Sequence, residues 1–338
     1  MNTNSRKINS RIMVSICCIT YNHENYISQA IESFLGQKTN FEFEILIHDD
    51  ASTDKTAEKI KYYAEKYPNI VKPILQTENQ YSKGLSISSI DPKYNYSRAK
   101  GKYIALCEGD DFWISEHKLQ QQVDYMESND DCTLCFHNAI IVNEGGIIVK
   151  DSFLPKNDFY SPYFNDTDSI YTTDQMILLD FIPTNSLFFR SSYLAEYGEF
   201  IDNKKYVCGD LPTRLFFSSK GYTYYFKEKM SAYRRGVPGS ASQRANSTYE
   251  SKLKTIQGHI DILNDFNIYT NAKYYESIEE AINLKLFSFF YQYGSLLVCK
   301  EQQYRHFLKR ASFKIRVGFF LRAHFPRIYT IISVIRRK

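Results

Sequence analysis

The segment CEGDDFW at residues 107–113 places three carboxylates within four positions. Glu108, Asp110 and Asp111 follow the apolar run YIAL, and an aromatic pair that includes the only tryptophan of the chain, Trp113, comes next. Carboxylates this close repel one another unless they share a proton or a cation. The spacing therefore predicts a loop that holds a divalent cation.

Two other polar segments follow apolar runs in the same way. TYN lies at residues 20–22 and HDD at residues 48–50. The runs that precede the three polar segments have the continuous apolar pattern of strands buried on both faces. In parallel sheets, ligands bind outside the carboxyl ends of the strands. We therefore expect these segments to form one pocket.

The first half of the chain alternates between strand and helix patterns. We expect strands at residues 11–20, 41–50, 70–76 and 101–107, and helices at residues 24–37, 52–67 and 116–128. This alternation predicts an α/β fold with a doubly wound, mostly parallel sheet and helices on both faces.

The turn after the first strand excludes two common classes of nucleotide site. It reads TYNHEN and has no glycine, whereas dinucleotide-binding folds and P-loops need a glycine-rich turn against the phosphates. A bound nucleotide diphosphate must be neutralised in another way. Mg²⁺ or Mn²⁺ on the acidic loop would do this, since these ions bind one or two carboxylates together with phosphate oxygens.

The pattern changes in the second half of the chain. Residues 132–142 and 183–190 read as strands, residues 222–235 as a pair of edge strands, and the chain turns helical from about residue 248. With 338 residues, we predict one α/β domain at residues 1–245 and a C-terminal helical region with a basic amphipathic tail at residues 246–338.

Charge is distributed unevenly along the chain. From Glu301 onward there are ten basic residues and one acidic residue, a net charge of +9, so the remainder carries −5 of the overall +4. The apolar pieces of this tail are too short to span a bilayer. We expect residues 305–338 to bind the cytoplasmic membrane surface in plane, with a final helix packed on the body as the alternative, and we expect no nucleic acid partner.

The cysteines point to the compartment. There are seven, an odd number without repeating spacing, and the N-terminal residues are polar and basic rather than apolar. This composition predicts no disulfide framework and a cytoplasmic location, peripheral to the membrane if the tail binds it.

The four motifs TYN, HDDASTDKT, GKYIALCEGDDFW and CGD, taken in this order, resemble those of the family 2 glycosyltransferases, which have the nucleotide-sugar-binding GT-A fold. The resemblance covers about residues 12–240. It implies an inverting, metal-dependent transfer of a sugar, with UDP as the expected nucleotide. The acceptor would be a saccharide or a lipid-linked saccharide in the synthesis of bacterial surface polysaccharide or glycolipid.

The resemblance also implies roles for residues at the nucleotide end of the site. Tyr21 would stack on the base, Asp50 would accept a hydrogen bond from the base edge, and Asn22 would help to order the turn. Thr20, Tyr21 and Asn22 would together belong to the residues that bind the nucleotide sugar. The alternatives are a half-buried ring for Tyr21 and a helix N-cap for Asp50.

At the sugar end, the resemblance implies that Asp111 binds the metal and that Asp110 contacts the ribose or the water shell of the metal. Glu108 would lie behind them or against the donor sugar. Trp113 would cover a sugar face, unless it packs on the following helix instead. Asp210 in CGD would be the base that deprotonates the acceptor, and its alternative is a helix N-cap.

One departure from the family pattern concerns the metal. Some members supply a late histidine ligand, but the corresponding segment YRRGVPGSASQR has none. Two other functions stay open from the sequence. A sugar nucleotidyltransferase would need a glycine-rich basic loop after the first strand, and a non-catalytic saccharide-binding protein would have no need of closely spaced acids.

Overall fold

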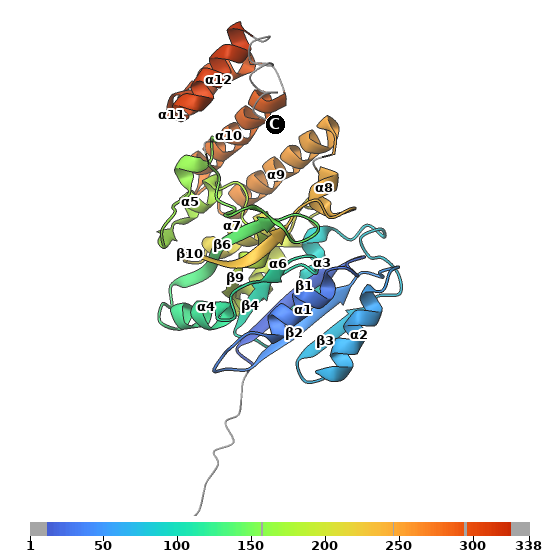
Figure 1. Ribbon diagram of the computed structural model, residues 1–338. Helices are drawn as coiled ribbons and strands as arrows, with labels where there is room; N and C mark the ends of the chain where they lie inside the picture. Colours follow the sequence, from blue (N-terminus) through green and yellow to red (C-terminus); the bar gives the residue numbers. More distant parts are fainter. Residues whose placement is uncertain (1–11, 157, 246, 294–295, 326–338) are drawn as a thin grey trace, which may run out of the picture. The chain divides into compact units, whose positions relative to one another are not determined.

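The computed structural model describes residues 12–156, 158–245, 247–293 and 296–325 (Figure 1). The chain divides into two compact units. The first comprises residues 1–153, 167–176 and 181–244, and the second comprises residues 154–166, 177–180 and 245–338. Two short segments that precede residue 245 thus belong to the second unit.

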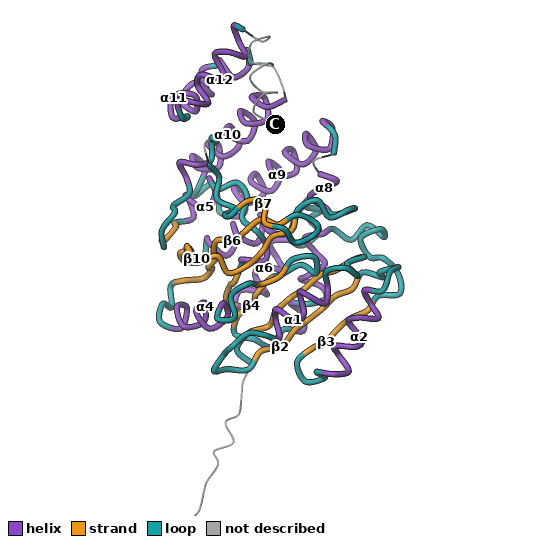
Figure 2. Tube along the Cα trace, in the orientation of Figure 1, coloured by secondary structure: helices purple, strands orange, loops and turns teal. Residues whose placement is uncertain are grey.

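Within the described residues, ten strands form one sheet in the first unit, and Figure 2 shows them in orange. The main order is β3-β2-β1-β4-β9-β6-β10-β5, with β7 beside β6 and β8 beside β10. The strands are β1 (Val14–Thr20), β2 (Phe43–Asp49), β3 (Val71–Leu75), β4 (Tyr103–Leu106), β5 (Phe112–Trp113), β6 (Cys132–Val142), β7 (Ile148–Lys150), β8 (Ser169–Tyr171), β9 (Phe188–Arg190) and β10 (Tyr222–Arg234).

The parallel part of this sheet is the part that the sequence predicted. β1 pairs in parallel with both β2 and β4, and β2 pairs in parallel with β3. β10 is also parallel to β6, while the short strands β5, β7, β8 and β9 pair antiparallel to their neighbours. This confirms the expected strands whose carboxyl ends are followed by the polar segments.

The helices associated with the first unit lie between its strands along the chain, except for the last one, which follows β10. They are α1 (Ile27–Leu35), α2 (Thr56–Lys66), α3 (Ile87–Tyr94), α4 (Lys118–Glu127), α5 (Thr173–Leu178), α6 (Leu194–Ile201), α7 (Asp210–Ser218) and α8 (Ala241–Ala245). In α1, the apolar residues at helical spacing, such as Ile27, Ile31 and Phe34, are fully buried in the core between helix and sheet.

Two expectations from the sequence were wrong. Residues 222–235 do not form a pair of edge strands, because β10 is one strand that lies between β6 and β5. Its register shifts between Phe226 and Ser231 interrupt the alternation and give the sequence its two-part appearance. The segment at 87–94, expected to be loop, forms α3 although it contains Pro92.

The second unit is helical in its described residues. Its helices are α9 (Tyr249–Tyr269), α10 (Tyr275–Tyr293), α11 (Arg305–Arg310) and α12 (Phe313–His324). An aromatic core that includes Phe159, Phe287 and Phe307 holds α10, α11 and α12 together. No helix in the described ranges is long and apolar enough to cross a membrane.

A buried lysine is the unusual feature of the first unit's core. Lys118, the first residue of α4, is fully buried, and its Nζ donates to Gln122 Oε1 at 2.7 Å. The ammonium group lies 4.2 Å from the centre of the Trp113 ring. Burial lowers the pKa of Lys118 to about 7, although the thiols of Cys107 and Cys135 oppose this shift. A neutral lysine is therefore compatible with the core near physiological pH.

We expect Lys118→Met to flatten the dependence of stability on pH. Above pH 7, Lys118 is still protonated in the unfolded chain but has largely lost its proton in the folded protein. The unfolded state therefore binds more protons, and Lys118 makes the free energy of unfolding rise with pH. Its contribution between pH 7 and pH 9 is about 2 kcal/mol. Urea unfolding at each pH measures the difference between wild type and variant. Lys61→Met, which changes an exposed lysine of α2, is the control, and parallel profiles for wild type and Lys118→Met would contradict the prediction.

Candidate functional site

A pocket of the first unit has a volume of about 460 Å³ and lies at the carboxyl ends of β1, β2 and β4. Of the residues predicted from the sequence, six line it: Thr20, Tyr21, Asp50, Glu108, Asp110 and Asp111. Three are not among its lining residues: Asn22, Trp113 and Asp210. The strand ends thus converge on one pocket, as expected for a parallel sheet.

The turn after β1 presents an aromatic ring at the pocket. Tyr21 is 43% exposed, in keeping with a ring that is available to a ligand. The next residue, Asn22, has a positive φ of 56° and bridges to the turn before α2. Its backbone N–H donates to Ser52 Oγ, and its Oδ1 accepts from the backbone N–H of Thr53, each at 2.8 Å. Asn22 therefore orders the turn that carries Tyr21, and it is not among the residues that line the pocket.

Asp50 anchors a loop that forms one wall of the pocket. Its two carboxylate oxygens accept from the backbone N–H groups of Gln80 and Tyr81, at 2.7 and 3.1 Å. Asp50 is not the N-cap of α2, since that helix starts at Thr56 and its cap is Lys55. The carboxylate thus holds the loop in place beside the pocket.

The Asp50 loop brings a second ring that sequence reasoning missed. Tyr81 is 51% exposed and lines the same pocket as Tyr21. The guanidinium carbon of Arg244 lies 5.8 Å from the centre of its ring. Tyr81 follows no strand directly and belongs to no motif, so only the hydrogen bonds to Asp50 reveal its place.

Glu108 is a half-buried acid of the pocket. Burial, with the negative charge of Asp110 as the next cause, raises the pKa of Glu108 to about 8. A hydrogen bond with Thr184 opposes this shift. Its Oε2 is buried and has no hydrogen-bond partner, and the same is true of the neighbouring Thr20 Oγ1. Two unsatisfied buried oxygens in one pocket indicate that a ligand group belongs there.

Gly109 permits the close approach of these groups. A Cβ at this position would lie 2.7 Å from Thr20 Oγ1 and 3.1 Å from His23 Nδ1. No other residue type fits there without displacing the end of β1. His23, which the sequence analysis did not select, also has an unpartnered buried Nδ1, and its Nε2 lies 3.8 Å from Asp110 Oδ2.

The two aspartates of the GDD segment have different environments. Asp111 is 2% exposed, and its Oδ1 accepts from the backbone N–H of Arg234 at 2.7 Å. Its Oδ2 accepts from Asn185 Nδ2 at 2.9 Å. The Asp110 side chain remains partly accessible, at 15%. The Asp111 carboxylate thus satisfies two buried donors, whereas the Asp110 carboxylate is the more accessible of the two.

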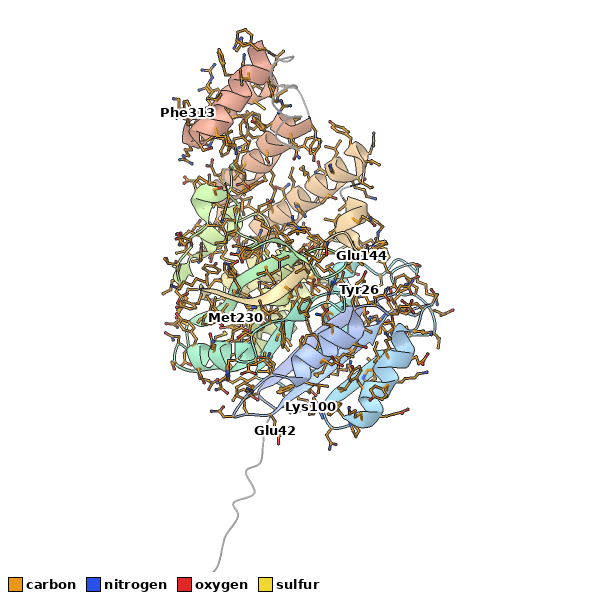
Figure 3. The ribbon with its side chains drawn as sticks, viewed as in Figure 1. Tyr26, Glu42, Lys100, Glu144, Met230 and Phe313 are labelled. Atoms are coloured by element: carbon orange, nitrogen blue, oxygen red, sulfur yellow. The ribbon has the colours of Figure 1, made fainter. Side chains whose placement is uncertain are left out.

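Arg234 locks the acidic loop to the end of β10. Its guanidinium donates to the carbonyl oxygens of Asp110 at 2.7 Å and Glu144 at 2.8 Å, and to Gln29 Oε1 at 2.8 Å. It also lies 4.7 Å from the ring centre of Tyr26, which Figure 3 labels near Glu144. Because its donors are used in this way, Arg234 orders the loop instead of reaching toward a diphosphate.

Trp113 belongs to the core and not to the pocket. Its ring is 4.7 Å from that of Phe34, and its indole N–H donates to the carbonyl of Asn185 at 3.1 Å. The side chain is 4% exposed. The packing alternative therefore holds for Trp113, and its expected contact with a sugar is corrected.

Asp210 is the first residue of α7 and follows the N-cap, Gly209. No side-chain hydrogen bond caps this helix. An added Cβ at Gly209 would lie 3.9 Å from the carbonyl of Ile87, a residue of the pocket wall. The negative charge of Asp210 contributes to the raised pKa of Glu108. Asp210 thus lies close to the pocket without lining it.

The donor set fits a divalent cation that shares its coordination with a ligand. In the part of the chain that the structure describes, no group of three or more histidine, cysteine or acidic residues could hold a metal. The Asp110 carboxylate and the unpartnered Glu108 Oε2 nevertheless face one pocket. This suits Mg²⁺ or Mn²⁺, which often take few protein carboxylates and complete their shell with phosphate and water.

Similarity to solved structures defines the class of fold. The TarS structure from S. aureus in complex with UDP-GlcNAc has a TM-score of 0.58 at 17% identity, over 94% of this chain and 88% of that one. The mannosyltransferase PcManGT from Pyrobaculum calidifontis, in complex with GDP-Man and Mn²⁺, has a TM-score of 0.51 at 13% identity, over 96% and 84%. The first unit therefore has a GT-A type fold.

The chain belongs to glycosyl transferase family 2, whose model matches residues 15–195. It is 32% identical over 138 residues to WfgD of Escherichia coli, named a UDP-Glc:alpha-D-GlcNAc-diphosphoundecaprenol beta-1,3-glucosyltransferase. That match covers 41% of this chain and 50% of WfgD. The chain spans about half the length of the curated relatives that it matches first. Asp210 lies beyond the segment matched by the family model.

The different environments of the two aspartates predict different effects on stability. Asp111→Ala should lower the free energy of unfolding by about 2–4 kcal/mol, because the buried N–H of Arg234 and amide of Asn185 lose their acceptor. Asp110→Ala should lower it by less than about 1 kcal/mol, since the partly accessible carboxylate holds no buried donor. Urea unfolding of the two variants measures both values. Equal destabilisation would contradict the distinction between them.

Proposed function

We propose that the chain is an inverting glycosyltransferase that uses a UDP-sugar and a divalent metal. The carrying observation is the pocket at the carboxyl ends of β1, β2 and β4, which has exposed tyrosine rings on its wall and the acids Glu108 and Asp110 in its lining. The rings suit the flat face of a base, and the acids suit a cation bound to a diphosphate.

The binding roles follow from this arrangement. Tyr21 stacks on the base, with Tyr81 as a second ring on the loop that Asp50 anchors. Asp110 holds the metal, and Glu108 meets either the metal or a hydroxyl of the ribose or sugar. The metal would neutralise the diphosphate and stabilise it as the leaving group.

Asp210 acts as the base. It accepts the proton of the acceptor hydroxyl while the acceptor oxygen forms a bond to the anomeric carbon and the bond to the diphosphate breaks. A position beside the pocket rather than in its lining suits this role, since the acceptor must approach from outside the donor. Support for UDP comes from WfgD, whose name specifies UDP-Glc as donor, and from the UDP-GlcNAc complex of TarS.

We propose a saccharide on a lipid carrier as the acceptor, in the synthesis of a bacterial surface polysaccharide or glycolipid. The name of WfgD specifies a saccharide on diphosphoundecaprenol as its acceptor. Such synthesis would take place at the cytoplasmic side of the membrane, in a compartment where thiols stay reduced. The seven cysteines, all present as free thiols, agree with this location.

Ligand binding tests the donor site directly. We expect UDP with Mn²⁺ to raise the melting temperature by a few degrees, since a ligand that binds only the folded state stabilises it. EDTA should remove the effect, and Asp110→Asn should weaken it strongly. Thermal unfolding of wild type, Asp110→Asn and the control Asp124→Asn, an exposed acid on α4, provides the comparison.

The nucleotide series decides between outcomes of that experiment. A rise in melting temperature with GDP or dTDP, and not with UDP, would change the nucleotide of the proposed donor. The proposed roles of the pocket residues would stay the same. Stability that is unchanged by every nucleotide, with or without metal, would refute the proposed donor site and favour a non-catalytic saccharide-binding protein.

The base has a test of its own. Asp210→Asn should lower the acceptor-dependent release of UDP at least about 100-fold and leave the UDP-induced thermal shift unchanged, because only proton transfer is lost. Asp202→Asn, at an exposed acid before α7, is the matched control. Transfer at the wild-type rate in Asp210→Asn, or an equal loss in Asp202→Asn, would exclude Asp210 as the base.

A further inference from the structure

The last described helix of the second unit, α12, has two apolar faces. Its inner face packs into the aromatic core of this unit through Ile315, which is 9% exposed, and through the partly buried Phe319. Arg322 lies on the same side, with Nη1 donating to the carbonyl of Tyr291. This face alone accounts for the attachment of α12 to the unit.

The outer face of α12 is apolar as well. Phe313 is 75% exposed, Val317 37% and Phe320 53%, and the label in Figure 3 locates Phe313 on this helix. At 100° per residue these positions lie within about 60° of one another on the helix surface. The ring of Phe325, just past the helix, is 6.0 Å from that of Phe320 and extends the patch. A contiguous exposed apolar stripe of this kind indicates a binding surface.

Cations border this stripe on both sides. Lys314 is rotated by about 100° from Phe313 in one direction and Arg316 by about 60° in the other. Both are exposed, and neither forms an ion pair with any residue in the described ranges. Lys309 on α11 adds a further exposed cation. Residues 302–325 contain no acid, so the charged residues of the segment that carries the stripe are all basic.

We propose that α12 binds in plane to an anionic lipid bilayer, with Phe313, Val317 and Phe320 in the headgroup region and Lys314 and Arg316 among the lipid phosphates. A bilayer surface offers both an apolar interior and negative charge, which match the stripe and its border. The helix has 12 residues and is therefore about 18 Å long, too short to span the hydrocarbon core.

Charge and shape disfavour the other occupants. A second copy of this face would bring cations against cations. A nucleic acid would pair with the cations but gives no reason for three aligned apolar side chains on the same face. The proposed membrane-binding surface lies within residues 305–325. The rest of the tail predicted from the sequence, residues 326–338, lies outside the described residues. The proposed membrane-binding surface is also independent of the donor site.

Sedimentation of the full-length protein with vesicles tests the proposal. We expect binding to vesicles of phosphatidylcholine mixed with phosphatidylglycerol, weak binding to phosphatidylcholine alone, and a loss of binding at high salt. Lys314→Glu with Arg316→Glu should weaken binding to the anionic vesicles at least about tenfold. Phe313→Ser with Phe320→Ser should weaken it to a similar extent at unchanged net charge.

Matched controls separate the surface from total charge and hydrophobicity. Lys61→Glu with Lys254→Glu makes the same change of charge at exposed residues of α2 and α9, and Ile268→Ser removes an apolar side chain that is 74% exposed. These variants should bind like wild type, and circular dichroism should show all variants folded. Three results would overturn the proposal. The first is that the protein does not sediment with any vesicle, and the second is that vesicle binding survives both double substitutions. The third is that the wild type self-associates without binding vesicles and that Phe313→Ser with Phe320→Ser removes this self-association.

Discussion

The concentration of negative charge at the carboxyl edge of the sheet is the constraint on which the site depends. Asp111 is buried and Glu108 half-buried within the same loop as Asp110, where an uncompensated carboxylate is unfavourable. The fold answers this in two ways. Backbone and amide donors from Arg234 and Asn185 satisfy Asp111 internally, while Glu108 Oε2 faces the pocket unpartnered. The remaining charge is available to a cation and its ligand.

The backbone of the GDD segment gives Asp110 and Asp111 different environments. Asp110 belongs to the turn after β4 and Asp111 directly precedes β5, and their carboxylates have different environments although the two residues are neighbours in sequence. The end of β10 completes the arrangement, since the backbone and guanidinium of Arg234 bond to both residues across 123 and 124 positions of the chain. An acidic loop attached in this way is ordered before any ligand binds, which under the proposed function would favour electrostatic stabilisation of the leaving group.

The two units treat charge differently. The first unit places acids at its pocket and neutralises them with short-range hydrogen bonds, whereas α11 and α12 of the second unit expose cations beside an apolar stripe. The chemistry of each matches a different part of one reaction: a diphosphate with its metal for the first, and a lipid surface that carries an acceptor for the second. Both assignments remain proposals, and each has its own experiment.

The sequence by itself determined the parallel α/β core and the polar strand ends that meet at one edge, because apolar periodicity and the position of acids after strands are local properties. It left open which aspartate of GDD is buried, and it put Trp113 in the pocket. Tertiary structure decided both, through Asn185, which lies more than 70 residues away and bonds to Asp111 and Trp113. Tyr81 and His23 were likewise recognised as pocket residues only from their contacts in the folded chain. Burial and hydrogen bonding between distant segments are not encoded in local spacing, so they appear only when the chain is folded.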